Sequence, residues 1–426
     1  MRNVVLRSLL VMMGTGWGEV PDPAPRATSG DGRVEPAWDE RLTVRVGIGD
    51  GEIRGSSEVA IQGAIDLVAR RGGGTVEILP GTYRLRNSVF LASGVRLTGH
   101  GAGTVLVKES SVSAALTEDS DWYDQEITLS GAEGFRVGDG ICLRAPSARY
   151  VIKRTLVARS GNRFRLDRAL RDNLWTGEGK AVAETLYPLI SGEGIESFVV
   201  EKLTLDGNRE RNGMLDGNYA GCVWLQDCRD GVLRELDARN YHGDGLSWQV
   251  CHDMTVERCV SRGHSGLGLH PGSGSQRSRI VGCRLEGNDM GIFFCWGVRG
   301  GVAEGNVIRG NRVGISMGHR DTDNLVKGNE ISGSLETGLL FRGEKDAGAA
   351  AHRNVIEGNQ FLDNGPEGGA AVTVAAPVQG IVLRGNQFRE SRGGGRQAVK
   401  ITDEGSQLEA AGNEFHGMES GGIVNP

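Results

Sequence analysis

Apolar and polar residues recur in the second half of the chain with a period of about 23 residues. One position of the period holds leucine, then cysteine, then asparagine: Leu203, Leu236, Cys259, Cys283, Asn306, Asn329, Asn359, Asn386 and Asn413. The position two residues later is mostly apolar: Leu205, Ala238, Ser261, Leu285, Ile308, Ile331, Phe361, Phe388 and Phe415. Such a period is typical of a solenoid, in which each repeat adds one coil and buries its apolar face against the next.

A short segment of alternating polarity follows a glycine in each period, as in Gly245-Leu-Ser-Trp-Gln249. Because successive side chains of a strand point to opposite faces, the first and third residues after the glycine are predicted to face the core. They are Leu246, Trp248, Leu267, Leu269, Ile292, Phe294, Ile315, Met317, Leu339 and Phe341. The second residues are predicted to form one outward column, Trp224, Ser247, Gly268, Phe293, Ser316 and Leu340, and the fourth another, Gln226, Gln249, His270, Cys295, Gly318 and Arg342.

The chain ahead of the repeats predicts one helix followed by short strands. The larger apolar residues of 56–69 are spaced to lie on one helical face: Val59, Ile61, Ile65 and Val68. Three glycines at 72–74 end this helix, and short strands are predicted at 75–79, 89–91 and 95–97.

The period is absent between 120 and 186. Residues 135–143 and 155–166 alternate apolar and polar side chains instead, and Gly161-Asn162 is typical of a tight turn between strands. This part of the chain therefore predicts an antiparallel β insertion, after which the solenoid resumes.

The segment from Ile61 to Leu106, IQGAIDLVARRGGGTVEILPGTYRLRNSVFLASGVRLTGHGAGTVL, resembles the N-terminal start of pectate-lyase-like right-handed parallel β-helix proteins. The resemblance implies an all-β fold, a right-handed parallel β-helix solenoid with a short N-terminal capping helix and the antiparallel insertion. The predicted organisation is a leader or linker over 1–45, the cap helix and first coils over 46–119, the insertion over 120–190 and the main β-helix over 191–426. Several activities share this fold, so the resemblance alone does not choose among them.

The charge and hydropathy of the chain exclude some partners. The formal net charge is −6 and no long basic run is present, which argues against nucleic acid or an anionic membrane as the main partner. No segment is long and apolar enough to span a bilayer. Residues 1–17 resemble a signal peptide weakly, because the apolar run is short and no clear cleavage site follows. The cellular location is therefore left open, with export as one alternative.

The seven cysteines show no spacing typical of a zinc site. Cys259 and Cys283 share the column that later holds Asn306, which predicts buried free thiols. We predict no cofactor. A divalent metal held by three histidines, His264, His270 and His319, is an alternative because imidazoles are suitable ligands.

Ionisable residues gather on the coils between about 241 and 346, where five of the eight histidines fall. Small outward residues there give a low floor, with aromatic side chains beside it, which suits an extended glycan. The predicted catalytic residues are Asp244, His264, His270, His319, Arg320, Asp321 and Arg342. The predicted substrate-binding residues are Trp224, His242, Gln249, Asp289, Phe293, Trp296, Glu344 and Lys345.

These residues fit two kinds of reaction, hydrolysis of a glycosidic bond and removal of the C5 proton of a uronic acid. β-Helix enzymes of the polygalacturonase type carry Gly-Asp-Asp, Gly-His-Gly and Arg-Ile-Lys on successive coils, and this chain is similar only in part. Gly243-Asp244-Gly245 lacks the second acid, although Asp321 or Glu344 would supply the separated carboxylate that inverting hydrolysis needs. β-Elimination or C5 epimerisation of a uronic acid needs a base and a cation for the sugar carboxylate, which the histidines and arginines supply.

We therefore predict an enzyme that acts on a polysaccharide, either a lyase or an epimerase of a uronic-acid-containing glycan. A glycoside hydrolase is one alternative, and a glycan-binding or structural β-helix of the adhesin or tail-spike kind is another. The last coil shows no obvious cap, and an uncovered solenoid end favours strand pairing, so a homo-oligomer is also left open.

Overall fold

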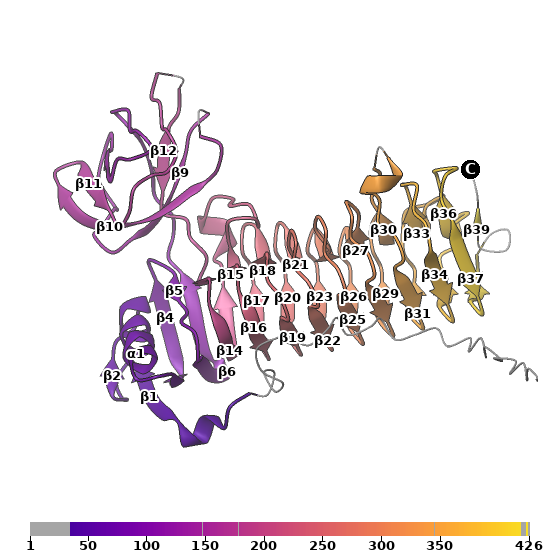
Figure 1. Cartoon of the computed structure of the whole chain (residues 1–426), viewed down its shortest axis with the longest axis horizontal. Coiled ribbons are helices and arrows are strands. Elements are labelled where there is room, and N and C mark those ends of the chain that lie inside the picture. The colour runs from indigo at the N-terminus through magenta and orange to yellow at the C-terminus, as the bar shows by residue number, and fades with distance from the viewer. Residues whose placement is uncertain (1–34, 147, 178, 345, 419–422, 425–426) are drawn as a thin grey trace, which may run out of the picture.

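A parallel β-helix forms most of the molecule, and its coils stack along the long axis (Figure 1). The computed structural model describes residues 35–146, 148–177, 179–344, 346–418 and 423–424. Most of the predicted leader lies outside these ranges. After a 3-10 turn at Trp38–Glu40, the first strand β1 begins at Leu42, slightly ahead of the predicted boundary at 46. The predicted right-handed β-helix is confirmed.

Each regular coil contributes one strand to an 11-stranded parallel sheet and two short strands to a 22-stranded parallel sheet. The 11-stranded sheet contains β5 (Val89–Phe90), β13 (Ile190–Glu193), β15 (Gly221–Gln226), β18 (Asp244–Gln249), β21 (Leu267–Pro271), β24 (Met290–Phe293), β27 (Val313–Met317), β30 (Thr337–Phe341), β33 (Ala370–Val374), β36 (Gln397–Ile401) and β39 (Ile423–Val424). Neighbouring strands in such a sheet lie about 4.8 Å apart, so equivalent side chains stack in columns.

The 22-stranded sheet forms the other walls of the solenoid. Its strands are β1 (Leu42–Gly47), β2 (Ile53–Arg54), β3 (Gly74–Ile78), β4 (Gly81–Leu85), β6 (Val95–Lys108), β14 (Glu196–Asp206), β16 (Arg229–Arg234), β17 (Asp237–Arg239), β19 (Thr255–Glu257), β20 (Val260–Arg262), β22 (Arg279–Val281), β23 (Arg284–Glu286), β25 (Val302–Glu304), β26 (Val307–Arg309), β28 (Leu325–Lys327), β29 (Glu330–Ser332), β31 (Val355–Glu357), β32 (Gln360–Leu362), β34 (Ile381–Arg384), β35 (Gln387–Arg389), β37 (Leu408–Ala411) and β38 (Glu414–His416). Of the ten residues predicted to face the core, nine are buried, and the prediction for Leu267 is wrong because this side chain is partly exposed.

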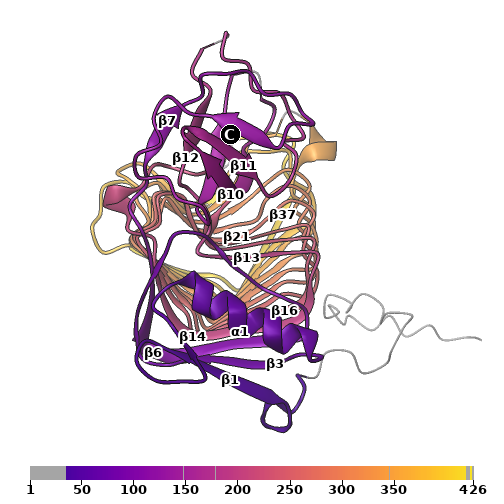
Figure 2. The same cartoon turned by 90° about the vertical axis from the view of Figure 1, so that its left-hand side faces the viewer.

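The predicted helix is α1 (Glu58–Arg70), which lies across the open end of the first coils (Figure 2). Ile61, Ile65 and Val68 are fully buried and belong to the main core. Val59 was predicted on the same face, but it is 70% exposed. Ala60 and Ala64 are buried in its place, because their small side chains allow the helix to pack closely on the coils. The capping helix is therefore confirmed, with a slightly rotated apolar face.

The antiparallel insertion stands beside the N-terminal coils as a separate lobe (Figure 1). Its sheet contains β7 (Ser113–Ala115), β8 (Glu126–Thr128), β9 (Gly140–Arg144), β10 (Ile152–Ser160), β11 (Arg163–Leu166) and β12 (Val182–Glu184). These strands pair antiparallel and enclose a core of their own that includes Leu156, Phe164 and Leu174. The lobe begins at β7, ahead of the predicted boundary at 120, and β13 already belongs to the solenoid.

The recurring asparagines form a buried ladder inside the turns of the coils. Asn329 Oδ1 accepts hydrogen bonds from the backbone N–H and the Nδ2 of Asn306, at 2.9 and 2.8 Å. Asn329 Nδ2 donates to the carbonyl of Ala303 and to Asn359 Oδ1, both at 2.9 Å. The ladder thus satisfies polar groups that the turn buries. Cys283 directly precedes Asn306 in this column, and its backbone N–H donates to Asn306 Oδ1 at 2.8 Å. All seven cysteines are buried free thiols, as predicted for Cys259 and Cys283.

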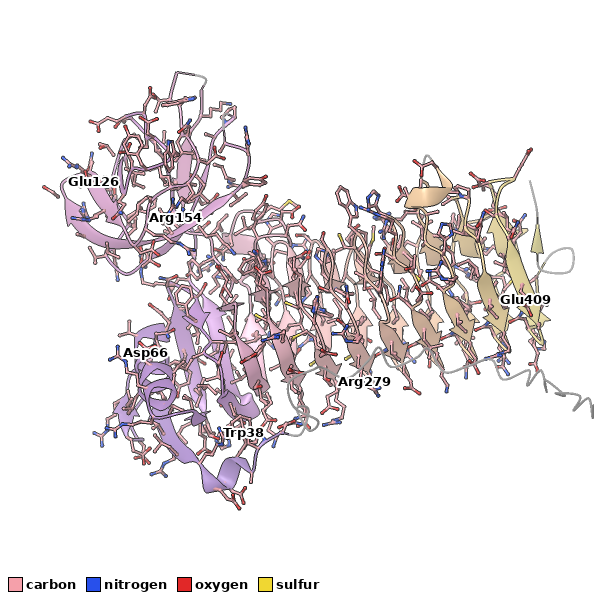
Figure 3. All side chains as sticks on the ribbon, in the orientation of Figure 1. Trp38, Asp66, Glu126, Arg154, Arg279 and Glu409 are labelled. Atoms are coloured by element: carbon pink, nitrogen blue, oxygen red, sulfur yellow. The ribbon has the colours of Figure 1, made fainter. Side chains whose placement is uncertain are left out.

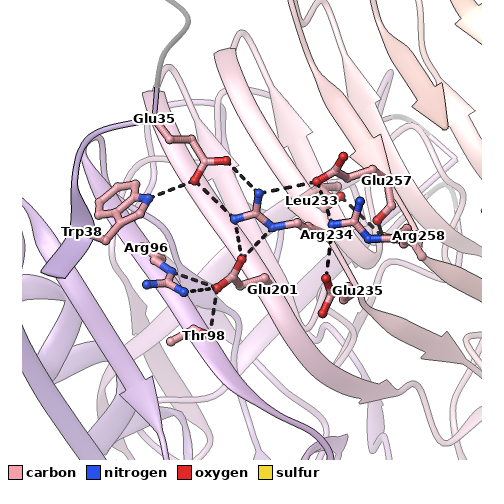
Figure 4. Close-up of polar contacts among 11 residues, drawn as sticks. Glu35, Trp38, Arg96, Thr98, Glu201, Leu233, Arg234, Glu235, Glu257 and Arg258 are labelled. Carbon is pink, nitrogen blue, oxygen red and sulfur yellow. Dashed lines mark hydrogen bonds and ion pairs between the residues drawn. The ribbon is translucent and has the colours of Figure 1, made fainter. Parts of the chain in front are cut away.

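A chain of ion pairs ties the start of the described chain to the 22-stranded sheet (Figure 4). Glu201 is buried between two guanidinium groups, those of Arg96 and Arg234. Burial alone would raise the pKa of Glu201, but the two arginines outweigh it and hold that pKa below its ordinary value. Arg234 also binds Glu35 at 2.8 Å, and Glu35 accepts the indole N–H of Trp38. This network anchors residues 35–38 to the first coils.

Among the helices that the structure describes, none has both the length and the apolar character needed to cross a membrane.

Candidate functional site

The outward column of the 11-stranded sheet differs from the predicted one at His270. The structure pairs Ser247 with His270 and Leu246 with Leu269, whereas the sequence pattern aligned Ser247 with Gly268 and Gln249 with His270. His270 pairs in turn with the coil that carries Phe293, and Phe293 stands beside Ser316. The predicted alignment was therefore wrong by two residues on this coil. The observed column runs Trp224, Ser247, His270, Phe293, Ser316, Leu340, Thr373 and Lys400.

The misalignment has a simple cause in the turn that precedes the strand. Two glycines occur there in each of the coils concerned, Gly243 and Gly245 in one and Gly266 and Gly268 in the next. The N–H of Gly266 donates to the carbonyl of Gly243, so the first glycines of the two coils stack on each other. The pattern had matched the second glycine of one coil with the first of the other.

The correction brings Asp244 and His270 together in a buried pair. His270 Nδ1 lies 2.8 Å from Asp244 Oδ2, and the two side chains are 3% and 4% exposed. Asp244 Oδ1 also accepts the N–H of Leu267 at 2.9 Å. Burial opposes a charge on His270, but the hydrogen bond to Asp244 and the neighbouring Cys295 outweigh burial and raise the pKa of His270 to about 9. The imidazole is therefore protonated at neutral pH.

The loop over 212–220 covers this pair. The hydroxyl of Ser247 donates to the carbonyl of Gly217 at 2.7 Å, and a Cβ placed on Gly217 would lie only 1.6 Å from Asp244 Oδ2. Only glycine therefore fits at 217 without moving the loop. Beneath it, the Nε2 atom of His270 is buried and has no hydrogen-bond partner among the described residues. The loop therefore closes the pair off from solvent.

An arginine joins the column next to His270. The Arg342 guanidinium lies over the ring of Phe293, 4.2 Å from its centroid, and the Phe293 ring contacts that of His270 edge to face at 5.4 Å. Arg342 also donates to Ser316 Oγ at 3.0 Å and to Asp321 Oδ2 at 3.1 Å. Its guanidinium is thus fixed over Phe293, the residue that contacts His270, while the side chain stays 18% exposed.

Asp321 supports this arginine from inside the turn. Its carboxylate accepts the N–H groups of Val298 and Gly318, at 2.9 and 2.8 Å, in addition to Arg342. Burial raises the pKa of Asp321 to about 6 despite these contacts. Burial likewise lowers the pKa of Arg342, although Asp321 acts in the opposite direction.

A second group of predicted residues lies on the turns next to the column. The exposed ring of Trp296 packs on His319 at a centroid distance of 4.5 Å. His319 Nδ1 is 3.4 Å from Glu344 Oε2, and the N–H of His319 donates to Glu344 Oε1 at 2.7 Å. Arg320 Nη2 is 3.3 Å from His319 Nε2. In contrast to His270, this histidine is partly exposed and reachable from solvent.

Several predicted site residues lie elsewhere. His264 is directed into the solenoid, where its Nδ1 accepts the N–H of Tyr241 at 3.1 Å, and burial lowers its pKa to about 4. Its placement inside the core separates it from the outward column, so we exclude His264 from the site. Asp289 forms an ion pair with Arg312, and His242 binds the carbonyl of Asn212.

The remaining predicted residues are Gln249, Trp224 and Lys345. Gln249 belongs with the buried pair, since its Nε2 lies 3.1 Å from Ser247 Oγ and 3.5 Å from His270 Nδ1. Trp224 is only 2% exposed, because the insertion covers it with Lys153. Lys345 lies outside the described residues. The sequence reasoning missed Lys153, because nothing in the repeat indicates that the insertion reaches this column.

The fold defines a single-chain right-handed parallel β-helix protein with one polar outward column and a covering lobe. The chain belongs to the family described as periplasmic copper-binding protein (NosD), which matches residues 171–400. It is 25% identical over 331 residues to mannuronan C5-epimerase AlgE2 of Azotobacter vinelandii, an alignment that covers 75% of this chain and 24% of the relative. The chain thus spans about a quarter of the length of the curated relatives it matches.

Two solved structures share the fold. The A-module of Azotobacter vinelandii mannuronan C-5 epimerase AlgE4 superimposes with a TM-score of 0.56 at 16% identity, covering 89% of this chain and 97% of that one. PfbA, a surface adhesin of Streptococcus pneumoniae, gives a TM-score of 0.51 at 14% identity, covering 89% and 93%. Both a catalytic and an adhesive protein therefore have this architecture.

The family description raises the question of copper. Copper sites in proteins combine several nitrogen and sulfur donors. His270 and Cys295 are neighbours, but the described ranges contain no group of three histidine, cysteine, aspartate or glutamate side chains suited to a metal. The three-histidine alternative fails as well, because His264 lies inside the core. The residues present do not fit a copper centre, and we derive no step through copper. That the protein needs no cofactor stays a prediction.

Proposed function

We propose that the chain modifies an acidic polysaccharide by removing the C5 proton of a uronic acid unit, as an epimerase does. The observation that carries this proposal is that Phe293 of the outward column contacts both His270, which is paired with Asp244, and Arg342. The similarity to mannuronan C5-epimerases over 75% of the chain supports the same substrate class.

The cations of the column would bind the sugar carboxylate. Arg342 presents a planar guanidinium that Asp321 and Phe293 hold in place, and a guanidinium can bind a carboxylate through two parallel hydrogen bonds. The protonated His270 adds a second positive charge from beneath the 212–220 loop. Neutralising the carboxylate stabilises the negative charge that develops when the C5–H bond breaks.

His319 is the side chain best placed to take the proton. Its Nδ1 faces Glu344, which fixes the ring and stabilises the imidazolium that forms, and its Nε2 accepts the proton once Arg320 turns toward the substrate. The electrons of the C5–H bond pass into the carboxylate as an enolate. Protonation on the opposite face gives the epimer, whereas loss of the substituent at C4 gives the unsaturated product of a lyase.

One observation favours hydrolysis as a second candidate. A carboxyl group with a raised pKa suits a general acid, and burial raises that of Asp321 to about 6. Its contacts to Arg342 and two backbone N–H groups, however, hold it inside the turn rather than toward a glycosidic oxygen.

The test is to incubate the full chain in D₂O with polymannuronate, polygalacturonate and a neutral glucan. An epimerase incorporates deuterium at C5 and inverts that carbon, which NMR detects. A lyase produces ultraviolet absorbance from an unsaturated uronate, and a hydrolase produces reducing ends without that absorbance. His319→Asn should abolish the change and Arg342→Lys should slow it at least about tenfold. Arg384→Lys, on the 22-stranded sheet and paired with Glu357, should have no effect. Unaltered glycans in every case would refute a catalytic role.

A further inference from the structure

A cavity of about 230 Å³ lies where the insertion meets the solenoid. The solenoid contributes Trp224 and Tyr219 to its wall, and the insertion contributes Lys153 and Arg171. Figure 3 shows Arg154, another residue of this wall, at the base of the insertion. The volume is below the range of about 300–1,000 Å³ that is usual for drug-sized ligands, so the cavity suits a single sugar-sized group.

The walls of this cavity carry more positive than negative charge. Four cationic side chains, Lys153, Arg154, Arg168 and Arg171, line it against two carboxylates, those of Asp172 and Glu193. Asp172 already accepts the N–H groups of Arg149 and Asn173. The chain as a whole has a formal net charge of −6, so a local excess of cations is a feature of this place and not of the surface in general.

Lys153 is the central residue of the cavity. Its ammonium donates to the carbonyl of Tyr219 at 2.7 Å and lies 2.8 Å from the centroid of the Trp224 ring. Among the residues that the structure describes, no carboxylate forms an ion pair with Lys153. An ammonium has three donors, and a carbonyl and a ring face occupy two of them. The third remains for a ligand, and a partly buried cation of this kind attracts an anionic oxygen.

The guanidinium of Arg154 binds backbone carbonyl groups of the insertion. It donates to the carbonyl groups of Lys153, Ala169 and Leu170, at distances of 2.5 to 3.1 Å, and so joins two segments of the insertion. Arg171, by contrast, is exposed, and no ion pair holds it among the described residues. Arg154 thus shapes the wall, while Lys153 and Arg171 are available to a ligand.

We propose that this cavity is a second binding site for the glycan, in which Lys153 and Arg171 hold the carboxylate of one uronic acid unit on the Trp224 side of the column. The proposal rests on the function given above, because it assumes an acidic glycan along the column. Trp224, Ser247 and His270 occupy successive coils, so the cavity lies about 10 Å from His270 at a spacing of about 4.8 Å per coil. It therefore receives a different sugar unit from the one that reacts.

Isothermal titration calorimetry with a short oligomannuronate tests this assignment. The ligand control is the same oligosaccharide with its carboxylates reduced to alcohols. Loss of a charge-assisted hydrogen bond should weaken binding about tenfold in Lys153→Gln and in Arg171→Gln. Lys153→Arg should restore most of the affinity. Arg165→Gln removes an exposed arginine of the same insertion outside the cavity and should bind as the unaltered chain does. Melting temperatures establish that each variant is folded.

Proton uptake provides a readout that a purely structural lysine would not give. Burial lowers the pKa of Lys153 to about 7, with Glu193 acting in the opposite direction and Arg168 reinforcing the decrease. Arg154 and Tyr219 also face the ammonium. A bound carboxylate raises this pKa again, so binding takes up a fraction of a proton near neutrality. Titrations in buffers of different ionisation enthalpy should detect the uptake, and Lys153→Gln should abolish it.

The outcomes separate this proposal from the catalytic one. Tight binding that depends on Lys153, without any change to the glycan, would support the cavity and refute the enzyme. A modified glycan, with affinity and proton uptake unaffected by Lys153→Gln and Arg171→Gln, would support the enzyme and overturn the cavity. Equal affinity for the carboxyl-reduced oligosaccharide would overturn the cavity as well.

Discussion

The Asp244→Asn variant tests whether the buried Asp244–His270 pair is ionised. Asparagine has nearly the same shape and keeps an oxygen for the N–H of Leu267, but it removes the negative charge 2.8 Å from His270 Nδ1. Burial lowers the pKa of His270, and in this variant the carboxylate that opposes this effect is absent. We expect the pKa of His270 to fall from about 9 to below its ordinary value of 6.5.

The size of the stability change follows from these two values. A histidine with a pKa of about 9 when folded and 6.5 when unfolded contributes about 2–3 kcal/mol to folding near pH 7. Because the folded pKa is the higher one, the contribution is complete below about pH 6.5 and is lost as the pH rises through about 9. Asp244→Asn should therefore lower the free energy of unfolding by about 2–3 kcal/mol near neutrality and by much less above about pH 10.

Histidine-selective NMR and denaturant unfolding measure these two effects. The chain has eight histidines, and His270→Gln identifies the signal that belongs to His270. Asp237→Asn is the matched control, since Asp237 pairs with Arg262 at 2.9 Å on the exposed surface, where such a pair contributes less than about 1 kcal/mol. A His270 signal that titrates alike in both proteins, or a stability loss that does not depend on pH, would refute the ionised pair.

Three other changes test the column and the core. Arg342→Lys should lower kcat/KM on a uronate glycan at least about tenfold, measured by C5 exchange, because lysine cannot form two parallel bonds to a carboxylate. Gly217→Ala should lower the same activity and the melting temperature, since the new Cβ would clash with Asp244. Asn329→Ala removes four buried hydrogen bonds and should lower the free energy of unfolding by about 3–4 kcal/mol, whereas Asn413→Ala, which is partly exposed, should cost less.

The sequence was sufficient to predict the solenoid because its core is periodic. Inward columns repeat the same residue types on each coil, as in the stacked rings of Phe361, Phe388 and Phe415, and a wrong fold would not reproduce that pattern. The exposed position of Val59 was not predictable in the same way. Whether the larger valine or the neighbouring alanine faces the coils depends on how closely α1 packs, which helical spacing alone does not determine.

The site was harder to predict because the outward column does not repeat the same residue type from coil to coil. A shift of two residues leaves the inward and outward alternation intact, so nothing in the polarity pattern reveals it. That shift decides whether His270 stands beside Gln249 or between Ser247 and Phe293. Likewise, His264 has the residue type of a catalytic group, but its position matches the turn asparagines that point inward, since its backbone N–H donates to Asn288.

The two histidines that remain, His270 and His319, have different surroundings, and the proposed function gives them different roles. His270 is held protonated by a buried carboxylate and is covered by the 212–220 loop, so it cannot accept a proton at neutral pH. His319 is reachable from solvent and is oriented by Glu344, so under the proposed function it is the histidine that meets the substrate. Uronate chemistry needs a base for the C5 proton and a fixed cation that neutralises the carboxylate, and the proposed function assigns these roles to His319 and Arg342. Inverting hydrolysis would instead need two carboxyl groups facing the substrate. Asp244 and Asp321 bind the cations of His270 and Arg342, and Glu344 binds His319. The arrangement of charges therefore supports C5 chemistry over hydrolysis.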